Sequence, residues 1–281
     1  MRHLSALIAV LAVTTVPLAA TAQETARPFS QCLAVAQALP NATYANFTPE
    51  SRPGPFKGPE ASKINASGDV RISYAGHSTY VLTTPGGVTI ATDYAGWSGG
   101  VQVPRVVTMN KAHSSHYTLA PDEGIEHVLR GWNVDSTPAE HNVMVDDVYV
   151  RNVTTDIRSY DGMEPDANSI FIFEVADLCI GHLGHLHHAL EDRHFAQIGR
   201  LDVVMVPVDG GLTLSHTGMS EIARRLQSSV LLPMHRRGMP LSSFITMMGD
   251  RFATDYVNSD TVTISARTLP RQPTIMVLKG V

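Results

Sequence analysis

Short runs of apolar and β-branched residues fill the chain from Asp69 onward, and they predict strands. Val70–Tyr74 alternates between apolar and polar positions, as a strand with one buried face does. Tyr80–Thr84 and Val88–Thr92 flank Pro85-Gly86-Gly87, where glycine supplies the positive φ of a hairpin turn. Four further runs predict strands, at Val103–Met109, Val148–Val153, Ile170–Glu174 and Leu178–Ile180. This part of the chain is therefore expected to be mostly β.

The pattern changes after about residue 190, where apolar residues recur at helical spacing. Predicted helices over Leu190–Ile198 and Met219–Leu226 each precede a buried strand, Val203–Pro207 and Val230–Pro233. The last predicted elements are a helix over Phe244–Phe252 and strands over Val262–Ser265 and Thr274–Leu278. Strands followed by alternating helices and strands indicate an α/β layered fold with mixed sheets.

The first 22 residues have the pattern of a secretory signal peptide. Arg2 and His3 precede the apolar run Leu4–Val16, and Ala20-Thr21-Ala22 offers a small-residue cleavage site. An N-terminal membrane anchor is the alternative, although the run is short for a bilayer. No other stretch is apolar enough to span a membrane. We therefore expect a periplasmic or secreted protein whose mature chain has no membrane span.

The division of the chain follows from these patterns. Residues 1–22 form the signal, and residues 23–68 form a leader that packs on the domain and has a helical patch at Leu33–Leu39. Residues 69–281 form the domain itself. Cys32 and Cys179 could pair in an oxidising compartment. Two separate buried thiols are the alternative, because Cys179 lies in a strand-like apolar run, and the sequence leaves both open.

The amino-acid composition indicates which classes of binding partner to expect. The formal net charge is −5, which gives no electrostatic case for nucleic-acid binding, since that needs a basic surface. Hydrophobic residues make up 43% and charged residues 17%, as in ordinary globular proteins. The expected partner is a small-molecule substrate, and the oligomeric state is not indicated. Thirteen histidines are many for this length, and their spacing points to the chemistry.

Four segments, taken in order, resemble the metallo-β-lactamase superfamily and within it the branch of the ascorbate phosphate lactonases. Tyr74 to Thr79 is similar to an early Gly-His-Ser signature, and Ile90 to Asp93 to a strand that ends in aspartate. Lys111-Ala112-His113-Ser114-Ser115-His116 stands where that family has His-x-His-x-Asp-His. The remaining segments are His182 to His188, similar to His-x-Gly-Asp-x-Gly-His, and Val206 to Gly211 followed by Leu232-Pro233-Met234-His235. The resemblance implies a four-layer αβ/βα sandwich with two mixed β-sheets.

The metal ligands of that family are only partly present. His113, His116 and His235 match family ligands. Four other positions differ: Lys111 replaces the first histidine, Ser115 the motif aspartate, His185 the bridging aspartate and Asp156 the mid-chain histidine. Because an imidazole offers one lone pair and a carboxylate two oxygens, His185 argues against a two-metal centre.

One divalent ion, with zinc as the first candidate, is therefore expected on four histidines, namely His113, His116, His185 and His235. Three histidines with an open position is the ligand pattern of a catalytic zinc, whose bound water reaches a pKa near 7. Lys111 and Asp156 are expected to form an ion pair where the family holds its first metal, and Lys111 or a nearby histidine to stabilise developing negative charge. His182, His187 and His188 are expected to be supporting or surface groups and not ligands. One of them is expected to orient a ligand or donate a proton, and His188 is the catalytic candidate.

Other histidines are expected outside the centre. His77 is expected to support the loops, and His127, His141, His194 and His216 to lie in loops or at the surface. The leading hypothesis is an exported hydrolase that uses a metal-bound hydroxide on a small ester, lactone or phosphoester. The alternative is a non-catalytic metal- or ligand-binding protein derived from such a hydrolase. The lost ligands favour the alternative, and the retained histidines favour the enzyme.

Overall fold

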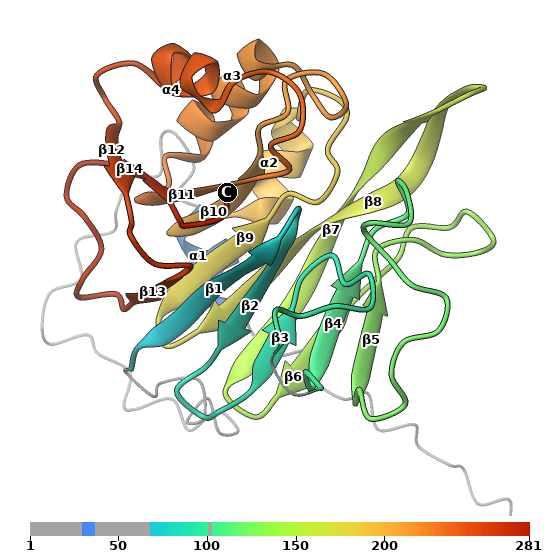
Figure 1. Ribbon diagram of the computed structural model, residues 1–281. Helices are drawn as coiled ribbons and strands as arrows, with labels where there is room; N and C mark the ends of the chain where they lie inside the picture. The colour runs from blue at the N-terminus through green and yellow to red at the C-terminus, as the bar shows by residue number, and fades with distance from the viewer. Residues whose placement is uncertain (1–29, 37–67, 101–102) are drawn as a thin grey trace, which may run out of the picture.

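Two β-sheets face each other at the centre of the computed structural model, which describes residues 30–36, 68–100 and 103–281 (Figure 1). Six strands form one sheet, in the order β13 (Thr261–Ile264), β1 (Val70–Gly76), β2 (Thr79–Thr83), β3 (Thr89–Ala91), β4 (Val106–Met109) and β5 (His127–Arg130). Eight strands form the other, in the order β12 (Ala253–Tyr256), β14 (Thr274–Val277), β11 (Val230–Met234), β10 (Val203–Pro207), β9 (Leu178–His182), β8 (Gly162–Val175), β7 (Val148–Ser159) and β6 (Asn142–Val145).

Both sheets are mixed. In the six-stranded sheet β13, β1, β2 and β3 pair antiparallel, whereas β3, β4 and β5 are parallel. In the eight-stranded sheet the run from β6 to β9 is antiparallel, and the pairs from β9 to β12 are parallel. Parallel neighbours need crossover connections, which are usually helical. In this sheet α2 (Asp192–Ile198), α3 (His216–Leu226) and α4 (Leu241–Met248) lie in them (Figure 1). The expected α/β class with two mixed sheets is confirmed.

A continuous apolar core fills the space between the sheets. Ile72, Leu82 and Ile90 come from the six-stranded sheet, and Phe171 and Phe173 come from the eight-stranded one. All five side chains are fully buried. Their alternation along each strand is the reason that these segments could be recognised from sequence.

The predicted hairpin turn is also confirmed. β2 and β3 pair antiparallel with Thr83 opposite Thr89. Gly86 allows a close approach, because a Cβ there would lie 2.6 Å from the carboxyl carbon of Asp147. The Gly86 amide instead donates to Asp147 Oδ2 at 2.6 Å. That contact ties the turn to β6 and β7.

Several elements differ from the prediction. β7 and β8 are 12 and 14 residues long, because antiparallel pairing carries them beyond their apolar segments to a tip at Ser159 and Gly162. α3 begins at His216, where the Ser215 side chain accepts from the Gly218 amide and caps the helix. α4 ends at Met248 instead of continuing to residue 252. β5, β6 and β12 were not predicted, since their exposed polar residues hide the apolar pattern.

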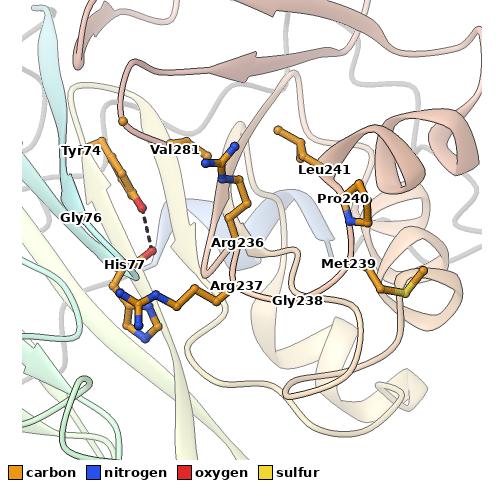
Figure 2. Close-up of a pocket in the computed structure, with 11 residues that line it drawn as sticks. Tyr74, Gly76, His77, Arg236, Arg237, Gly238, Met239, Pro240, Leu241 and Val281 are labelled. Atoms are coloured by element: carbon orange, nitrogen blue, oxygen red, sulfur yellow. Dashed lines mark hydrogen bonds between the residues drawn. The ribbon is translucent and has the colours of Figure 1, made fainter.

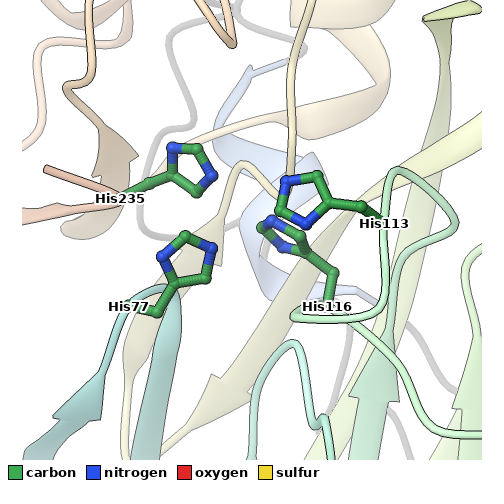
Figure 3. A group of neighbouring side chains, drawn as sticks. All are labelled: His77, His113, His116 and His235. Atoms are coloured by element: carbon green, nitrogen blue, oxygen red, sulfur yellow. The ribbon is translucent and has the colours of Figure 1, made fainter. Parts of the chain in front are cut away.

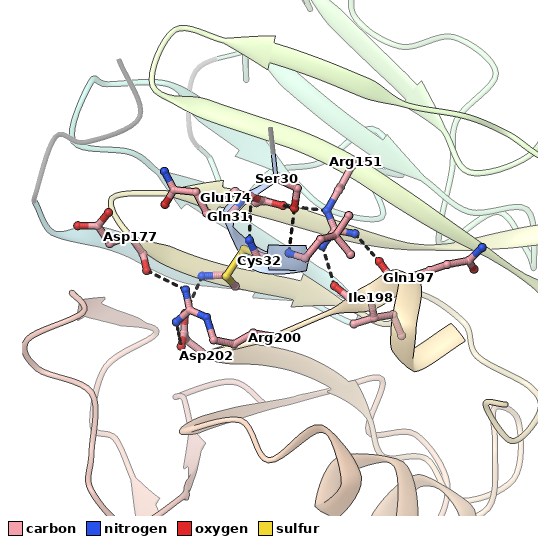
Figure 4. Close-up of a disulfide and its surroundings, with 12 residues drawn as sticks. Ser30, Gln31, Cys32, Arg151, Glu174, Asp177, Gln197, Ile198, Arg200 and Asp202 are labelled. Atoms are coloured by element: carbon pink, nitrogen blue, oxygen red, sulfur yellow. Dashed lines mark hydrogen bonds and ion pairs between the residues drawn. A yellow bond between two sulfur atoms is a disulfide. The ribbon is translucent and has the colours of Figure 1, made fainter. Parts of the chain in front are cut away.

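The predicted signal and most of the leader lie outside the described residues. Within the leader, α1 (Gln31–Ala36) overlaps the predicted helical patch. Cys32 is joined to Cys179 by a disulfide, which decides the alternative that the sequence left open (Figure 4). In the described part of the chain, no helix is both long and apolar enough to cross a membrane.

A buried ion pair reinforces the attachment of α1 to the sheet, which the disulfide also provides. Glu174 accepts from Arg151 Nε at 2.8 Å, and both side chains are about 5% exposed or less. The same carboxylate accepts from Ser30 Oγ at 2.5 Å and from the Gln31 amide at 2.9 Å (Figure 4). Arg151 also donates to the carbonyls of Gln197 and Ile198 at the end of α2. Because each charge is paired, the pair tolerates burial and fixes α1 to the sheet.

Candidate metal centre

Four histidines from three loops meet at one edge of the sandwich. His77 follows β1, His113 and His116 follow β4, and His235 follows β11. Each offers one ligand atom, and these atoms lie within 4.8 Å of one another (Figure 3). All three loops leave the carboxyl ends of their strands, so strands of both sheets position the group and the loops carry its side chains.

His116 is held by a buried carboxylate. Its Nδ1 lies 2.6 Å from Asp93 Oδ2, and neither side chain is exposed. Burial alone would raise the pKa of Asp93, but nearby His182 and His116, and a hydrogen bond from Asn110, lower it below its ordinary value. The ionised carboxylate only accepts, so the imidazole hydrogen lies on Nδ1. Nε2 then presents its lone pair.

His235 is held by a carboxylate in the same way, with Asp209 in the role that Asp93 has for His116. Its Nδ1 lies 2.9 Å from Asp209 Oδ2. Asp209 Oδ1 accepts three backbone amides, and its Oδ2 also accepts from Thr213 Oγ1 at 2.5 Å. Burial alone would raise the pKa of Asp209. The hydrogen bonds from His235, Thr213 and the backbone amides outweigh that effect together, so the pKa lies below its ordinary value. Nε2 of His235 therefore also presents its lone pair.

Both of these Nε2 atoms are buried and have no hydrogen-bond partner within the described residues. A buried polar atom without a partner is costly and rare in a native fold. A carboxylate behind Nδ1 and a free lone pair on Nε2 is the usual arrangement of a metal-binding histidine. His116 and His235 thus fit a divalent ion.

Three more imidazoles border the same space. Ser115 Oγ lies 2.9 Å from His77 Nε2 and 2.7 Å from His113 Nδ1, so one hydroxyl joins both rings. Burial, followed by the charges of neighbouring histidines, lowers the pKa of His77 and His113 to about 4 and that of His185 to about 2. These rings are therefore neutral near pH 7, which is the form that binds metals.

A row of imidazoles leads away from the cluster and fixes the hydrogen on each ring. The Arg158 amide donates to His187 Nδ1 at 2.6 Å, so the His187 hydrogen lies on Nε2 and points to His185 Nδ1 at 2.8 Å. His185 therefore carries its hydrogen on Nε2, which lies 3.1 Å from His113 Nε2. In this order His185 donates to His113 and does not face the cluster with a lone pair.

The predicted ligand set is thus brought together with one exchange. His113, His116 and His235 belong to the four-histidine group, and His77 takes the place that we expected for His185. His185 still lies close, with its ring centroid 4.7 Å from those of His116 and His235. His77 was expected only to support the loops. The signal that could have placed it is its position directly after a strand, as for His235.

The predicted Lys111–Asp156 ion pair was wrong. Lys111 pairs with Glu164 of β8, and no ion pair joins it to Asp156 within residues 103–281. Asp156 lies at a β-bulge between Thr155 and Ile157, where its carboxylate accepts the Asp166 amide at 3.1 Å. The register of β7 and β8, which the sequence pattern did not reveal, decides these partners.

His188 contacts Asp156 and not the cluster. Its Nε2 accepts the Asp156 amide at 3.1 Å, and its Nδ1 lies 2.8 Å from the Ala189 carbonyl. The buried His182 likewise uses both nitrogens, with Ser78 and Gly184 as partners. His194 and His216 were expected in loops or at the surface, but both are buried, within α2 and at the start of α3.

The carboxylate behind His235 offers a test of orientation. Asp209→Asn keeps the side-chain shape, and because three amides hold Oδ1, the new NH₂ group faces His235 Nδ1. That contact favours the tautomer with its hydrogen on Nε2, the atom that should bind the metal. We expect metal affinity to fall about 10–100-fold in competition with a chromogenic chelator. Asp202→Asn, which changes a buried carboxylate that pairs with Arg200 instead, should leave affinity unchanged. Equal affinities in both variants would refute the orienting role.

Comparisons with known proteins agree with this geometry. A sequence-family model described as a β-lactamase superfamily domain matches residues 71–235, more than half of the chain. No curated protein shows significant sequence similarity to the chain. Three similar solved structures are a proposed zinc-dependent hydrolase of the metallo-β-lactamase superfamily from Thermotoga maritima, a proposed metal-dependent hydrolase from Parabacteroides distasonis and the metallo-β-lactamase fold protein YhfI from Bacillus subtilis.

These structures support the fold. The first is 24% identical and covers 74% of this chain and 98% of its own, with a TM-score of 0.54. The second is 15% identical, and the match covers 66% of this chain and 90% of the other, with a TM-score of 0.50. The third is 9% identical, and the match covers 75% of this chain and 97% of the other, with a TM-score of 0.50. The predicted metallo-β-lactamase-like sandwich with two mixed sheets is confirmed.

Proposed function

The chain belongs to the β-lactamase superfamily, and on that basis we propose that it is a metal-dependent hydrolase acting on a small ester, lactone or phosphoester. The observation that carries the proposal is the pair of buried Nε2 atoms of His116 and His235, each backed by a carboxylate. The relatives named as metal-dependent hydrolases and the similarity of the sequence motifs to the ascorbate phosphate lactonase branch support the same class.

The histidines and aspartates of the candidate centre have separate roles in this proposal. His116 and His235 would hold one divalent ion, zinc being the first candidate, and His77 would complete its ligands. His113 borders the same space, but its Nε2 lone pair accepts from His185. Such an ion supplies a Lewis acid that polarises the scissile group and activates water. Asp93 and Asp209 orient the ligand rings.

Behind the ligands, His185 holds a proton on Nε2, directed at His113, and its orientation is set by His187. This hydrogen bond fixes the plane of the His113 ring. His185 therefore acts as an orienting group in the proposed centre, and its place among the ligands stays a prediction of the sequence alone.

We also propose that the protein is exported. The disulfide supports this, because disulfides persist in oxidising compartments such as the periplasm and are rare in the cytosol. The signal-like pattern of residues 1–22 supports it independently.

Chelation gives the test of the proposed activity. Protein purified without chelator should contain about one divalent ion per chain and should hydrolyse at least one member of a panel of nitrophenyl esters, lactones and phosphodiesters. Removing the ion should abolish hydrolysis, and adding zinc should restore it, because the Lewis acid is essential. Two equally tight ions would contradict the single-metal site. A firmly bound ion without hydrolysis of any substrate would favour the non-catalytic binding protein.

A further inference from the structure

A pocket of about 430 Å³ lies directly beside the candidate metal centre. Tyr74 and His77 line one side of it, and the loop from Arg236 to Leu241 lines the other (Figure 2). His77 belongs both to this pocket and to the four-histidine group. A molecule bound here would therefore reach the proposed metal.

The charged side chains that line this pocket all carry positive charge. Arg236 and Arg237 both contribute to its lining, and no aspartate or glutamate side chain does so among the described residues. Neither guanidinium forms an ion pair within the part of the chain that the structure describes. Arg105, Arg151 and Arg200, by contrast, each pair with a carboxylate. The two cations thus share the pocket with no aspartate or glutamate among its described lining residues.

The loop that carries the arginines is fixed relative to the metal centre. At its start the His235 amide donates to the His77 carbonyl at 2.7 Å, and near its end the Met239 amide donates to the Asp209 carbonyl at 2.8 Å. The Tyr74 hydroxyl donates to the same His77 carbonyl at 3.1 Å (Figure 2). Burial raises the pKa of Tyr74 while the charge of Arg236 counteracts it, which indicates that this guanidinium lies near the phenol.

Guanidinium groups recognise oxyanions through paired, charge-assisted hydrogen bonds. The amino end of α4 follows the arginines at Leu241, which also lines the pocket, and its backbone amides add a partial positive charge. We propose that this arginine pocket, defined by Tyr74, His77, Arg236, Arg237 and Leu241, binds a carboxylate or phosphate group of the substrate. The inference rests on the proposed hydrolase function and names its substrate class, a small anionic ester or lactone.

A binding experiment tests the pocket without any catalysis. Inorganic phosphate and, separately, acetate are titrated by calorimetry against chelator-treated protein, so that the anion cannot bind a metal ion. The double variant Arg236→Met/Arg237→Met should bind the preferred anion at least about tenfold more weakly than wild type, since two charge-assisted contacts are lost. The matched control Arg267→Met/Arg271→Met removes the same charge at exposed positions outside the pocket and should bind like wild type. Absence of binding to wild type, or equal loss in both double variants, would overturn the proposal.

A kinetic experiment separates this proposal from the proposed activity. For the metal-loaded enzyme, the ratio of kcat/KM for p-nitrophenyl succinate to kcat/KM for p-nitrophenyl acetate should fall at least about tenfold in the Arg236/Arg237 variant and stay constant in the control. Hydrolysis of both esters with an unchanged ratio would refute the arginine pocket and leave the hydrolase intact. If neither ester nor any other panel member is hydrolysed, the hydrolase fails, and the phosphate and acetate titrations still decide whether the pocket binds anions.

Discussion

Replacing His235 by alanine is expected to weaken binding of the divalent ion by more than about 100-fold and to abolish hydrolysis. Removing a partner that only orients a ligand costs about 10–100-fold in affinity, so removing the ligand itself should cost more. The fold should survive, because Asp209 keeps three amides and the Thr213 hydroxyl as donors. His116→Ala is a poorer test, since among the described residues Asp93 would retain only Asn110 as a side-chain donor.

Two measurements check this result, metal content after dialysis and the thermal unfolding midpoint of the chelator-treated protein. His127→Ala is the matched control, because His127 lies on β5 outside the cluster and is partly exposed. It should retain the metal and the activity. Full metal occupancy in the His235→Ala protein would show that the metal lies elsewhere.

Breaking the disulfide between Cys32 and Cys179 is expected to lower the free energy of unfolding by about 2–5 kcal/mol. The two cysteines are 147 positions apart, so the crosslink restricts a long loop of the unfolded chain. Loss of the bond also weakens the anchor of α1, whose amides face the buried Arg151–Glu174 pair. Urea unfolding of the Cys32→Ala/Cys179→Ala protein measures the change.

Reductant provides the control for that experiment. It should destabilise the wild type to a similar extent and leave the double-alanine protein unaffected. Cys179 lies near the start of β9, whereas His185 follows the end of that strand, so metal affinity should not change in either case. A double-alanine protein as stable as the oxidised wild type would show that the disulfide adds nothing to stability.

Much of the fold could be predicted from local patterns. Alternation in Val70–Tyr74 and the glycines at Gly86-Gly87 gave β1 and the β2–β3 hairpin, because these features act within a few residues. The full lengths of β7 and β8 could not be predicted in this way. Their outer halves are polar, and pairing across the hairpin holds them in extended form.

The site was predictable where a motif fixed it. His113, His116 and His235 were named as ligands from their resemblance to a family motif, and the structure places them in one cluster. The partners of Lys111 and Asp156 depend on strand register and a β-bulge, which spacing along the chain does not encode. The donor role of His185 depends on a hydrogen bond that begins at the Arg158 amide, 27 positions earlier in the chain.

Anomalous X-ray scattering from crystals of the metal-loaded protein tests the central claim most directly. The account predicts one anomalous peak per chain, at about 2.0–2.1 Å from Nε2 of His116 and from Nε2 of His235 if the ion is zinc. A peak that lies away from these two atoms, or no peak in protein that contains stoichiometric metal, would contradict it.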